Sequence, residues 1–524
     1  MSDSTLLRNG QNGTSTAPPF EKLVPLETLP DKLRAHRERG ETIVQCHGVF
    51  DLLHPGHVRH FKAAKQEGEV LVVTLTPDRF VNKGPGRPVF NELLRAEFIA
   101  SLESVDYVAI NHWPTAVEVI GEVRPDVYVK GSDYADDKDD LTGKIVDERE
   151  AVEAHGGRVH FTQDITFSST RLLNNHFNVF SEEAEVFLEG FRRRWSADDI
   201  IGMLDSLHDM KVLVIGDIII DEYHFCQAMG MASKSTTINA KYLDGERHAG
   251  GVLAVANHVA GFCDTVHLVS LVGDEDDQVE FIESKLNPKI SSRFFSRPDG
   301  PTTRKVRYLH KYQYQKMFEL TYIEDGPLPQ QVEENLNQYV QEIASDYDLV
   351  LVTDFGHGMI GPSTVAALAE TAPFIALNTQ VNSANRGFNA LTKYPRADYV
   401  CIDQEEIRHT YHDRFGPLQD LIQKAVDDLS ASFVTVTRGH RGSTTYRRGN
   451  GMHHTPVFSE QAVDTIGAGD AFLSITSPLA ARGYPAEVIS FVGNAVGALA
   501  IQVLGNRSSV QPVELKKYIT TLLK

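Results

Sequence analysis

Two histidines stand three residues apart in the stretch HGVFDLLHPGHVRH, at 47–60. His54 and His57 enclose a proline and Gly56, just after an apolar run that ends at Cys46. If a helix starts here, its free N–H groups and positive dipole end can hold a phosphate, and Gly56 permits close approach. The two imidazoles can then donate hydrogen bonds to a triphosphate whose charge grows during attack at the α-phosphorus. Alone, the pattern fits a histidine-bearing surface helix equally well.

A glycine-rich turn precedes an aspartate in the stretch AVDTIGAGDAF, at 462–472. Gly467, Ala468 and Gly469 are small enough to expose consecutive backbone N–H groups to a phosphate. Asp470 can orient or deprotonate an attacking hydroxyl, so the stretch offers both features that phosphoryl transfer requires. A turn of this kind can equally be structural.

The elements that must position these residues alternate along the chain. Between about 40 and 175, short β-branched runs such as TIVQC, EVLVVTLT and DYVAI are separated by segments of helix length. From Lys211 a second series begins, with mostly continuous apolar runs of the kind that is buried on both faces of a sheet. The sequence therefore predicts an α/β protein with two doubly wound parallel-sheet domains. Different motifs and no common period indicate a fusion rather than a repeat.

Composition and helix signals set the expected boundaries. The expected parts are a disordered N-terminal tail and lead-in at 1–35, a first domain at 36–176, a helical linker at 177–208 and a second domain at 209–524. The first 19 residues are rich in Ser, Thr, Asn, Gly and Pro, which favours disorder. In the linker, Ser181 and Ser196 precede acidic residues as helix N-caps do.

Acidic residues outnumber basic ones by 71 to 51, which gives the 524-residue chain a net charge of −20. This balance argues against nucleic acid or an anionic membrane as a partner. No charged-then-apolar leader opens the chain, and no apolar run approaches the roughly 18 residues of a membrane span. Four scattered cysteines without C-x-x-C spacing favour a reducing compartment. We therefore expect a cytoplasmic protein with no nucleic-acid or membrane partner.

Further stretches accompany the histidine pair: KGPGRPVFNELLRAEFIASLESVDYV, RPDVYVKGSDY and FSSTRLL. With GVFDLLHPGH they make residues 42–171 resemble the H-x-G-H nucleotidyltransferases, specifically the cytidylyltransferase-like sugar-phosphate nucleotidylyltransferases. The resemblance implies that His54 and His57 stabilise the transition state. It also implies nucleotide or phosphate contacts at Gly48, Phe50, Gly56, Lys83, Arg87, Lys130, Gly131, Asp133, Ser168, Ser169 and Thr170. His47 stands where the family usually has Asn, which leaves ATP and CTP open as the nucleotide.

The second half carries an ordered series of motifs: GDIIIDEYHF, AGGVLAVANHVAGF, VSLVGDE, TTRKVRY, TDFGHGMI, TVTRGHRGS and FVGNAVGALAIQVLGN. With the glycine-rich turn they make 211–524 resemble the ribokinase-like (PfkB) sugar kinases. The resemblance implies that Asp470 is the catalytic base and Glu406 a candidate metal ligand. The implied anion hole is Gly467, Ala468 and Gly469; the implied sugar contacts are Asp221, Gly250, Gly251, Lys305 and Arg307; and the implied ATP contacts are Thr437, Gly439, Gly442 and Asn494.

Residues 226–248 resemble the β lid of such kinases, which often pairs with a second subunit, so we expect a homodimer through the lid. Together the halves resemble the bifunctional sugar kinase/sugar-1-phosphate nucleotidylyltransferases of the heptose-7-phosphate kinase/heptose-1-phosphate adenylyltransferase type, whose familiar form has the kinase first. The resemblance implies a Rossmann-like domain before a ribokinase-like one. It implies ATP-dependent phosphorylation at C1 of a phosphorylated sugar, and nucleotidyl transfer from ATP or CTP to a sugar 1-phosphate, with Mg²⁺ on the phosphates.

Several positions depart from the kinase pattern. Ala254 replaces an Asn that reads the sugar, Asn378-Thr379-Gln380 replaces DPK, and Asp403 replaces the Asn of an N-x-x-E motif. Loss of an amide that pairs with a sugar hydroxyl changes discrimination strongly. We therefore expect a different sugar. One alternative is a non-catalytic kinase half that serves as a ligand-binding or dimerisation module; another is a CTP-dependent polyol-phosphate cytidylyltransferase.

Overall fold

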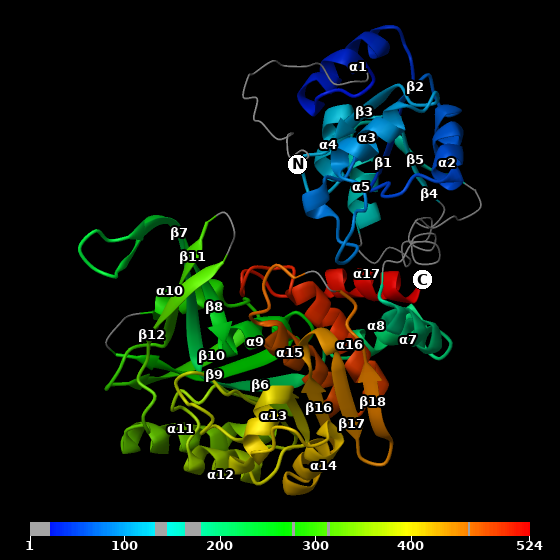
Figure 1. Cartoon of the computed structure of the whole chain (residues 1–524). Helices are drawn as coiled ribbons and strands as arrows, with labels where there is room; N and C mark the ends of the chain where they lie inside the picture. The colour runs from blue at the N-terminus through cyan, green and yellow to red at the C-terminus, as the bar shows by residue number, and fades with distance from the viewer. Residues whose placement is uncertain (1–20, 132–143, 163–179, 275–277, 312–314, 460–461) are drawn as a thin grey trace, which may run out of the picture. The chain divides into compact units, whose positions relative to one another are not determined.

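A computed structural model of the chain describes residues 21–131, 144–162, 180–274, 278–311, 315–459 and 462–524. The chain forms two compact units, 1–83 with 87–177 and 84–86 with 178–524. In each unit, helices cover both faces of a largely parallel sheet (Figure 1). The predicted α/β class with two doubly wound domains is confirmed.

The first unit contains a five-stranded parallel sheet of order β3-β2-β1-β4-β5. Its strands are β1 (Ile43–Gly48), β2 (Val70–Leu75), β3 (Tyr107–Ile110), β4 (Val127–Gly131) and β5 (Arg158–Thr162). Its helices are η1 (Leu26–Thr28), α1 (Leu29–Glu38), α2 (Pro55–Lys65), η2 (Asp78–Phe80), α3 (Glu92–Ala100), α4 (Val117–Val123) and α5 (Lys144–Glu153). Cores under α1, α4 and α5 and under α2 and α3 bury both faces of the sheet. Strand order reverses between β1 and β4, where such sheets leave a crevice for a ligand.

The lead-in before residue 36 is part of the first core. Leu26, Leu29 and Leu33 are almost fully buried, and the Val24 N–H bonds the Val108 carbonyl at 2.9 Å. Residues 21–35, expected as a lead-in ahead of the first domain, thus contribute to its core, because the apolar face of α1 packs on the sheet. The disorder expected for the first 19 residues lies outside the described residues.

The second unit contains a nine-stranded sheet of order β10-β9-β6-β13-β14-β15-β16-β17-β18, in which β17 and β18 run antiparallel at one edge. Its strands are β6 (Lys211–Gly216), β9 (Thr265–Gly273), β10 (Ile290–Arg297), β13 (Leu349–Asp354), β14 (Ile375–Thr379), β15 (Tyr399–Asp403), β16 (Phe433–Thr437), β17 (Ser443–Arg447) and β18 (Gly451–Thr455). One face packs on α9 (Val252–Ala260), α10 (Val279–Lys285), α15 (Ala468–Ala481), α16 (Ala486–Ala500) and α17 (Pro512–Leu523). The other packs on α11 (Gln330–Ile343), α12 (Pro362–Thr371), α13 (Gln404–Tyr411) and α14 (Leu418–Asp428), with short η4 (Ala344–Asp346), η5 (Leu391–Lys393) and η6 (Gly439–Arg441) between elements.

The two helices expected as a linker belong to the second unit. They are α7 (Glu182–Arg192) and α8 (Ala197–Asp205), and the predicted caps are confirmed because Ser181 and Ser196 accept backbone N–H bonds at the helix starts. Leu188 and Phe191 are fully buried in the same core as α16, where Phe191 stacks on Phe491 at 4.3 Å between ring centres. The apolar face of each helix thus packs inside the second unit, so the two helices are not a free linker.

A separate four-stranded sheet of order β12-β11-β7-β8 projects from the second unit (Figure 1). Its strands are β7 (Ile218–Met231), β8 (Ile238–Gly251), β11 (Arg304–His310) and β12 (Lys316–Tyr322). Strands β7 and β8 form the hairpin that contains the expected lid segment 226–248. Large apolar side chains on its outer part, among them Met229, Met231 and Ile238, are exposed.

None of the described helices combines the length and the apolar character needed to cross a bilayer. All four cysteines are free thiols buried inside the protein. Burial raises the pKa of each thiol, which fits the absence of any chemical role assigned to them.

Candidate active sites

The histidine pair lies where β1 passes into α2, as the sequence predicts. His54 is the N-cap of α2, and its ring accepts the Gly56 N–H at 3.1 Å. The rings of His54 and His57 stack with centres 3.9 Å apart. Phe50, whose φ of 47° turns the chain sharply, places its ring edge-on to His57 at 5.4 Å. The turn after Gly48 therefore brings both imidazoles to the start of one helix.

Both histidines are held neutral at physiological pH. The pKa of His57 is lowered to about 3, first by burial and then by electrostatic repulsion between a protonated His57 and its neighbours, Lys83 among them. The pKa of His54 is also lowered, chiefly by burial. A neutral imidazole still offers one N–H to an anion, so the pair suits hydrogen bonding to phosphate rather than proton transfer. The charge of Lys83 lowers the pKa of both His54 and His57, so Lys83 lies near this pair, where a positive charge was expected.

Arg87, expected to reach a phosphate, is instead paired inside the protein. Its Nε lies 3.1 Å from a carboxylate oxygen of Asp51, and both side chains are almost fully buried. Asp51 also accepts the Val89 N–H at 2.6 Å, so the pair fixes the loop that carries Arg87. In this arrangement Arg87 positions the loop around the histidines.

Sequence reasoning missed Arg95, which sits on α3 with 1% of its surface exposed. Its guanidinium donates to the carbonyls of Val49, Thr76 and Phe90 and to the Asp78 carboxylate at 2.6 Å. It thereby ties together the loops that follow β1 and β2. The available signal was a lone arginine between apolar residues in LLRAEFIA.

The end of β4 supplies the other predicted nucleotide contacts of this unit. Gly131 ends β4, which neighbours β1 across the reversal of strand order, and Lys130 just before it pairs with Glu148 at 2.8 Å. His47, the unusual residue at the end of β1, contacts the hydroxyls of Thr74 at 2.9 Å and Thr76 at 3.2 Å. The remaining predicted residues of this site, Asp133, Ser168, Ser169 and Thr170, lie outside the described part of the chain.

In the second unit, the glycine-rich turn starts α15 as predicted. Gly467 is the N-cap with φ +80°, a backbone region that favours glycine, and Asp470 lies in the first helical turn. Asp470 is buried, and burial, followed by the nearby charge of Asp221, raises its pKa to about 7. The charge of Lys305 and a hydrogen bond from Gln380 at 3.2 Å act in the opposite direction. A carboxylate with this pKa can accept a proton near neutral pH.

The predicted sugar contacts converge on Asp221, which is 3% exposed. Its oxygens bind Arg307 and the Asn506 amide, the latter at 3.0 Å. A Cβ at Gly250 would come within 2.2 Å of the Asp221 carboxylate, so a larger residue here would displace that carboxylate. Lys305 is half-buried, and this burial lowers its pKa. The other predicted glycine of this group, Gly251, has φ +55° at the start of α9.

A cavity of about 680 Å³ opens beside the start of α15. The predicted residues that line it are Glu406, Thr437, Gly439, Gly442, Ala468, Gly469 and Asn494. Its apolar wall includes Phe472, Val457 and Ile501. The structure thus brings together, at a volume suited to a nucleotide, residues that are separated by almost a hundred positions.

Three of the departures from the kinase pattern, Asn378, Gln380 and Asp403, line this cavity. Asn378 donates to the Cys401 carbonyl at 2.8 Å, while its buried side-chain oxygen has no hydrogen-bond partner among the described residues. Asp403 caps α13 in a capping box with Glu406. Glu406 accepts two backbone N–H groups, at 3.2 and 3.0 Å, and burial raises its pKa to about 7. Ala254, on α9, is buried.

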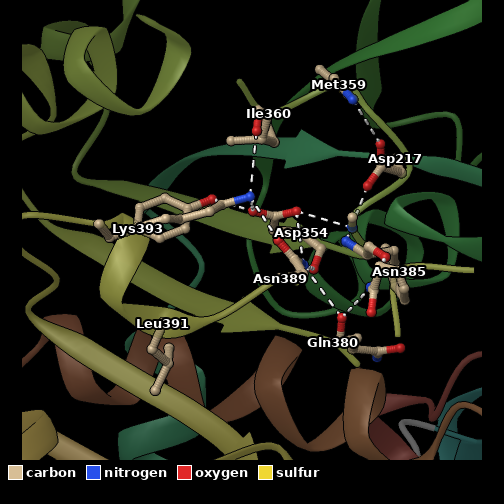
Figure 2. Close-up of polar contacts among 12 residues, drawn as sticks. Asp217, Asp354, Met359, Ile360, Gln380, Asn385, Asn389, Leu391 and Lys393 are labelled. Carbon is tan, nitrogen blue, oxygen red and sulfur yellow. Dashed lines mark hydrogen bonds and ion pairs between the residues drawn. The ribbon is translucent and has the colours of Figure 1, made fainter. Parts of the chain in front are cut away.

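A buried carboxylate fixes the loop that follows β13 (Figure 2). Asp217 accepts the backbone N–H groups of Phe355, His357 and Met359 at 3.0 to 3.3 Å. Burial and the charge of Asp354 raise the pKa of Asp217 to about 7. The sequence motif GD before β7 gave no sign of this role.

A second set of contacts fixes the main chain at Gln380, also shown in Figure 2. Its carbonyl accepts the amides of Asn385 at 2.8 Å and Asn389 at 3.3 Å. Asn389 also donates to Asp354, which pairs with Lys393. Because the main chain at Gln380 is fixed, its side-chain amide is held in position to donate to Asp470.

Comparison with known proteins agrees with this geometry. The family model described as pfkB family carbohydrate kinase matches residues 209–513, and the cytidylyltransferase-like model matches residues 46–175. The Bifunctional protein HldE of Syntrophotalea carbinolica is 40% identical over 146 residues, which cover 28% of each protein. That of Geobacter metallireducens is 36% identical over 194 residues, which cover 33% of this chain and 38% of the relative. The chain thus aligns with well under half of each of these relatives.

Among solved structures, phosphofructokinase-2 from Escherichia coli in complex with potassium has a TM-score of 0.50 at 14% identity, covering 60% of this chain and 100% of that chain. This likeness shows a shared fold. Both matched families consist of transferases, so the chain is a transferase enzyme. It belongs to the pfkB family of carbohydrate kinases, and it carries a cytidylyltransferase-like domain ahead of the kinase domain.

Proposed function

We propose that the chain makes a nucleotide-activated sugar in two reactions. The second unit phosphorylates C1 of a phosphorylated sugar with ATP, and the first transfers a nucleotidyl group from ATP or CTP to a sugar 1-phosphate after a separate phosphatase has removed the other phosphate. The main support is that one chain holds two unrelated helix starts, at α2 and α15, each with the reactive side chains its chemistry requires. Relatives named as bifunctional proteins agree with this proposal.

In the kinase reaction, Asp470 takes the proton of the C1 hydroxyl as that oxygen attacks the γ-phosphorus and ADP leaves. The backbone N–H groups of 467–469 donate hydrogen bonds to the phosphoryl oxygens and stabilise the negative charge that develops on them. Lys305 and Arg307 hold the phosphate already on the sugar. The support is that Asp221 and Lys305 lie close enough to Asp470 to affect the pKa of its carboxyl group.

In the transferase reaction, a phosphate oxygen of the sugar 1-phosphate attacks the α-phosphorus and pyrophosphate leaves. The attacking group is already anionic, so no general base is required. His54 and His57 donate hydrogen bonds to the triphosphate, aided by Lys83 and the N-terminus of α2. The contact of His47 with two threonine hydroxyls is the feature on which the choice between ATP and CTP would depend.

Magnesium would arrive with the triphosphates, where it neutralises charge and orients the phosphates. No group of three or more acidic, histidine or cysteine side chains that could hold a metal occurs among the described residues. This fits an ion held mainly by phosphates and water, with the Glu406 carboxylate on the cavity wall as the nearest protein candidate.

A homodimer through the lid and a cytoplasmic location complete the proposal. The lid carries exposed Met229, Met231 and Ile238, an apolar surface that a second copy would cover. Four free cysteines and a net charge of −20 favour a reducing, cytoplasmic compartment without nucleic-acid partners.

The experiment uses the full chain with a panel of sugar phosphates and either ATP or CTP, and follows ADP formation and pyrophosphate release separately. We expect both products, each with its own preferred sugar. Pyrophosphate without ADP across a broad panel would remove the kinase half of the proposal. ADP without pyrophosphate would remove the other half.

A second candidate is that the kinase unit binds a ligand without catalysis. The replacement of DPK by residues that include Gln380, whose amide contacts Asp470, and the small buried Ala254 favour it. In that case Asp470→Asn leaves every activity unchanged. If CTP and a polyol phosphate give the fastest pyrophosphate release, the chain is instead a polyol-phosphate cytidylyltransferase.

A further inference from the structure

A second cavity of about 310 Å³ lies in the kinase unit, where α13, α14, η6 and β17 meet. Its polar lining includes three arginines, Arg408, Arg438 and Arg441, together with Gln404 and Thr444. It shares no lining residue with the nucleotide cavity. The two cavities nevertheless flank the same backbone, because Asp403, Thr437 and Gly439 face the nucleotide cavity while their neighbours in sequence face this one.

The described residues give the three arginines neutral hydrogen-bond partners, although the Asp413 carboxylate, which accepts the Gly416 N–H at 2.6 Å, also attracts Arg408 from farther away. Arg438 and Arg441 both donate to the side-chain oxygen of Gln404, at 3.3 and 3.2 Å. Arg408 donates to the carbonyls of residues 413 and 416, each at 3.1 Å. In the described part of the chain, no carboxylate lies within 4.0 Å of any of the three guanidinium groups. Glu183 attracts Arg438 only from farther away, and its carboxylate contacts His454.

The α14 helix adds to this positive potential. Its 11 residues begin at the cavity, where Gly416, Leu418 and Gln419 are part of the lining. Pro417 is the N-cap, and no side chain caps the helix. The first-turn N–H groups and the positive end of the dipole therefore face the same space as the guanidinium groups. Burial and the charge of Arg441 lower the pKa of Arg438, so the two cations repel each other until an anion joins them.

We propose that this cavity binds a phosphate monoester and that its occupancy is linked to nucleotide binding in the neighbouring cavity. Planar guanidinium groups converging on a space next to a helix N-terminus match the oxygens of a phosphate dianion. The volume exceeds that of inorganic phosphate and suits a small phosphorylated metabolite such as a sugar phosphate. Linkage follows because Gln404 and Arg438, which would move to meet the anion, adjoin Asp403 and Thr437 of the nucleotide cavity.

Arginine labelling tests the site directly in the full chain, without requiring catalysis, so its failure is distinguishable from failure of the proposed enzyme activities. Phenylglyoxal modification of Arg438 and Arg441 is quantified by peptide mass spectrometry with glucose 6-phosphate, inorganic phosphate or glucose. At about ten times its dissociation constant, a competing ligand slows labelling about elevenfold. We expect protection by glucose 6-phosphate or inorganic phosphate and none by glucose. Equal labelling under all conditions, or equal protection by glucose, overturns the proposal.

Two further comparisons make the test specific. Arg414, which is exposed on the same loop and does not line the cavity, should label at the same rate with and without phosphate. The R438Q/R441Q variant should lose one class of glucose 6-phosphate binding in calorimetry, whereas the charge-matched R414Q/K424Q variant should keep it. Adding ADP should shift the midpoint of Arg438 protection about fivefold or more, as linked sites require; an unchanged midpoint overturns the linkage.

Discussion

Lowering the pH should stop the kinase reaction of this chain while leaving its nucleotidyl transfer intact. Asp470 must be ionised to accept a proton, and its pKa is raised to about 7. Below that value the ionised fraction falls about tenfold per pH unit, to about a tenth at pH 6 and about a hundredth at pH 5. His57, with a pKa lowered to about 3, stays neutral throughout, so the other reaction has no matching loss.

The assay measures kcat/KM for ADP formation and for pyrophosphate release on the same protein from about pH 5.5 to 9, the range in which an essential base of this pKa is revealed. Because substrate phosphates also titrate near neutrality, the Gln380→Met variant serves as the control. It removes a hydrogen bond to the charged form of Asp470, which should raise the pKa of that group by up to about one unit. The acidic limb should move to higher pH with it.

Two results would refute this reasoning. ADP formation that is flat between about pH 6 and 8 would mean that Asp470 is not the base with the pKa its surroundings give it. A limb that does not move in Gln380→Met would assign the titration to the substrate.

Three further predictions concern single residues. Asp470→Asn should lower ADP formation by about 10²- to 10⁴-fold without affecting pyrophosphate release. Because the pKa of Asp470 is raised in the folded state, its ionisation should lower the stability of the wild type as the pH rises from about 4 to 7. The variant should therefore have a higher melting temperature than the wild type at pH 8 but not at pH 4. His57→Asn should do the reverse for activity, with a loss of about 10²-fold or more in pyrophosphate release and ADP formation retained. Leu29→Ala should destabilise the first unit by about 2–5 kcal/mol in denaturant unfolding, whereas Leu93→Ala, at a side chain 58% exposed, should cost far less; equal costs would contradict the packing of α1.

Local patterns were sufficient for much of this molecule. The starts of α2 and α15, the caps at Ser181 and Ser196 and the alternation of strands and helices depend on neighbouring residues, and the structure confirms them. The residues that line the cavity beside α15 could be predicted only from the family resemblance. Residues 406 and 494 are far apart in the sequence, and the order of strands in the sheet brings them together.

Contacts over long sequence separations escaped prediction. The stacking of Phe191 on Phe491, three hundred positions away, decides that α7 belongs to the kinase core, and no local signal contains it. The ion pair of Arg87 with Asp51, which lies on a different loop, was not predicted. The amphipathic α1 was passed over because its apolar positions are few and are preceded by a polar tail.

The loop that follows β13 owes its shape to main-chain N–H groups that converge on Asp217. Such a loop can exchange its side chains and keep its course, because every residue except proline carries the donor that Asp217 requires. A substitution at His357 or Met359 keeps this backbone contact, but both side chains are buried, so the replacement must also fill the same space. Replacing Asp217 instead leaves three buried main-chain donors without their acceptor, at a cost of about 1–3 kcal/mol each.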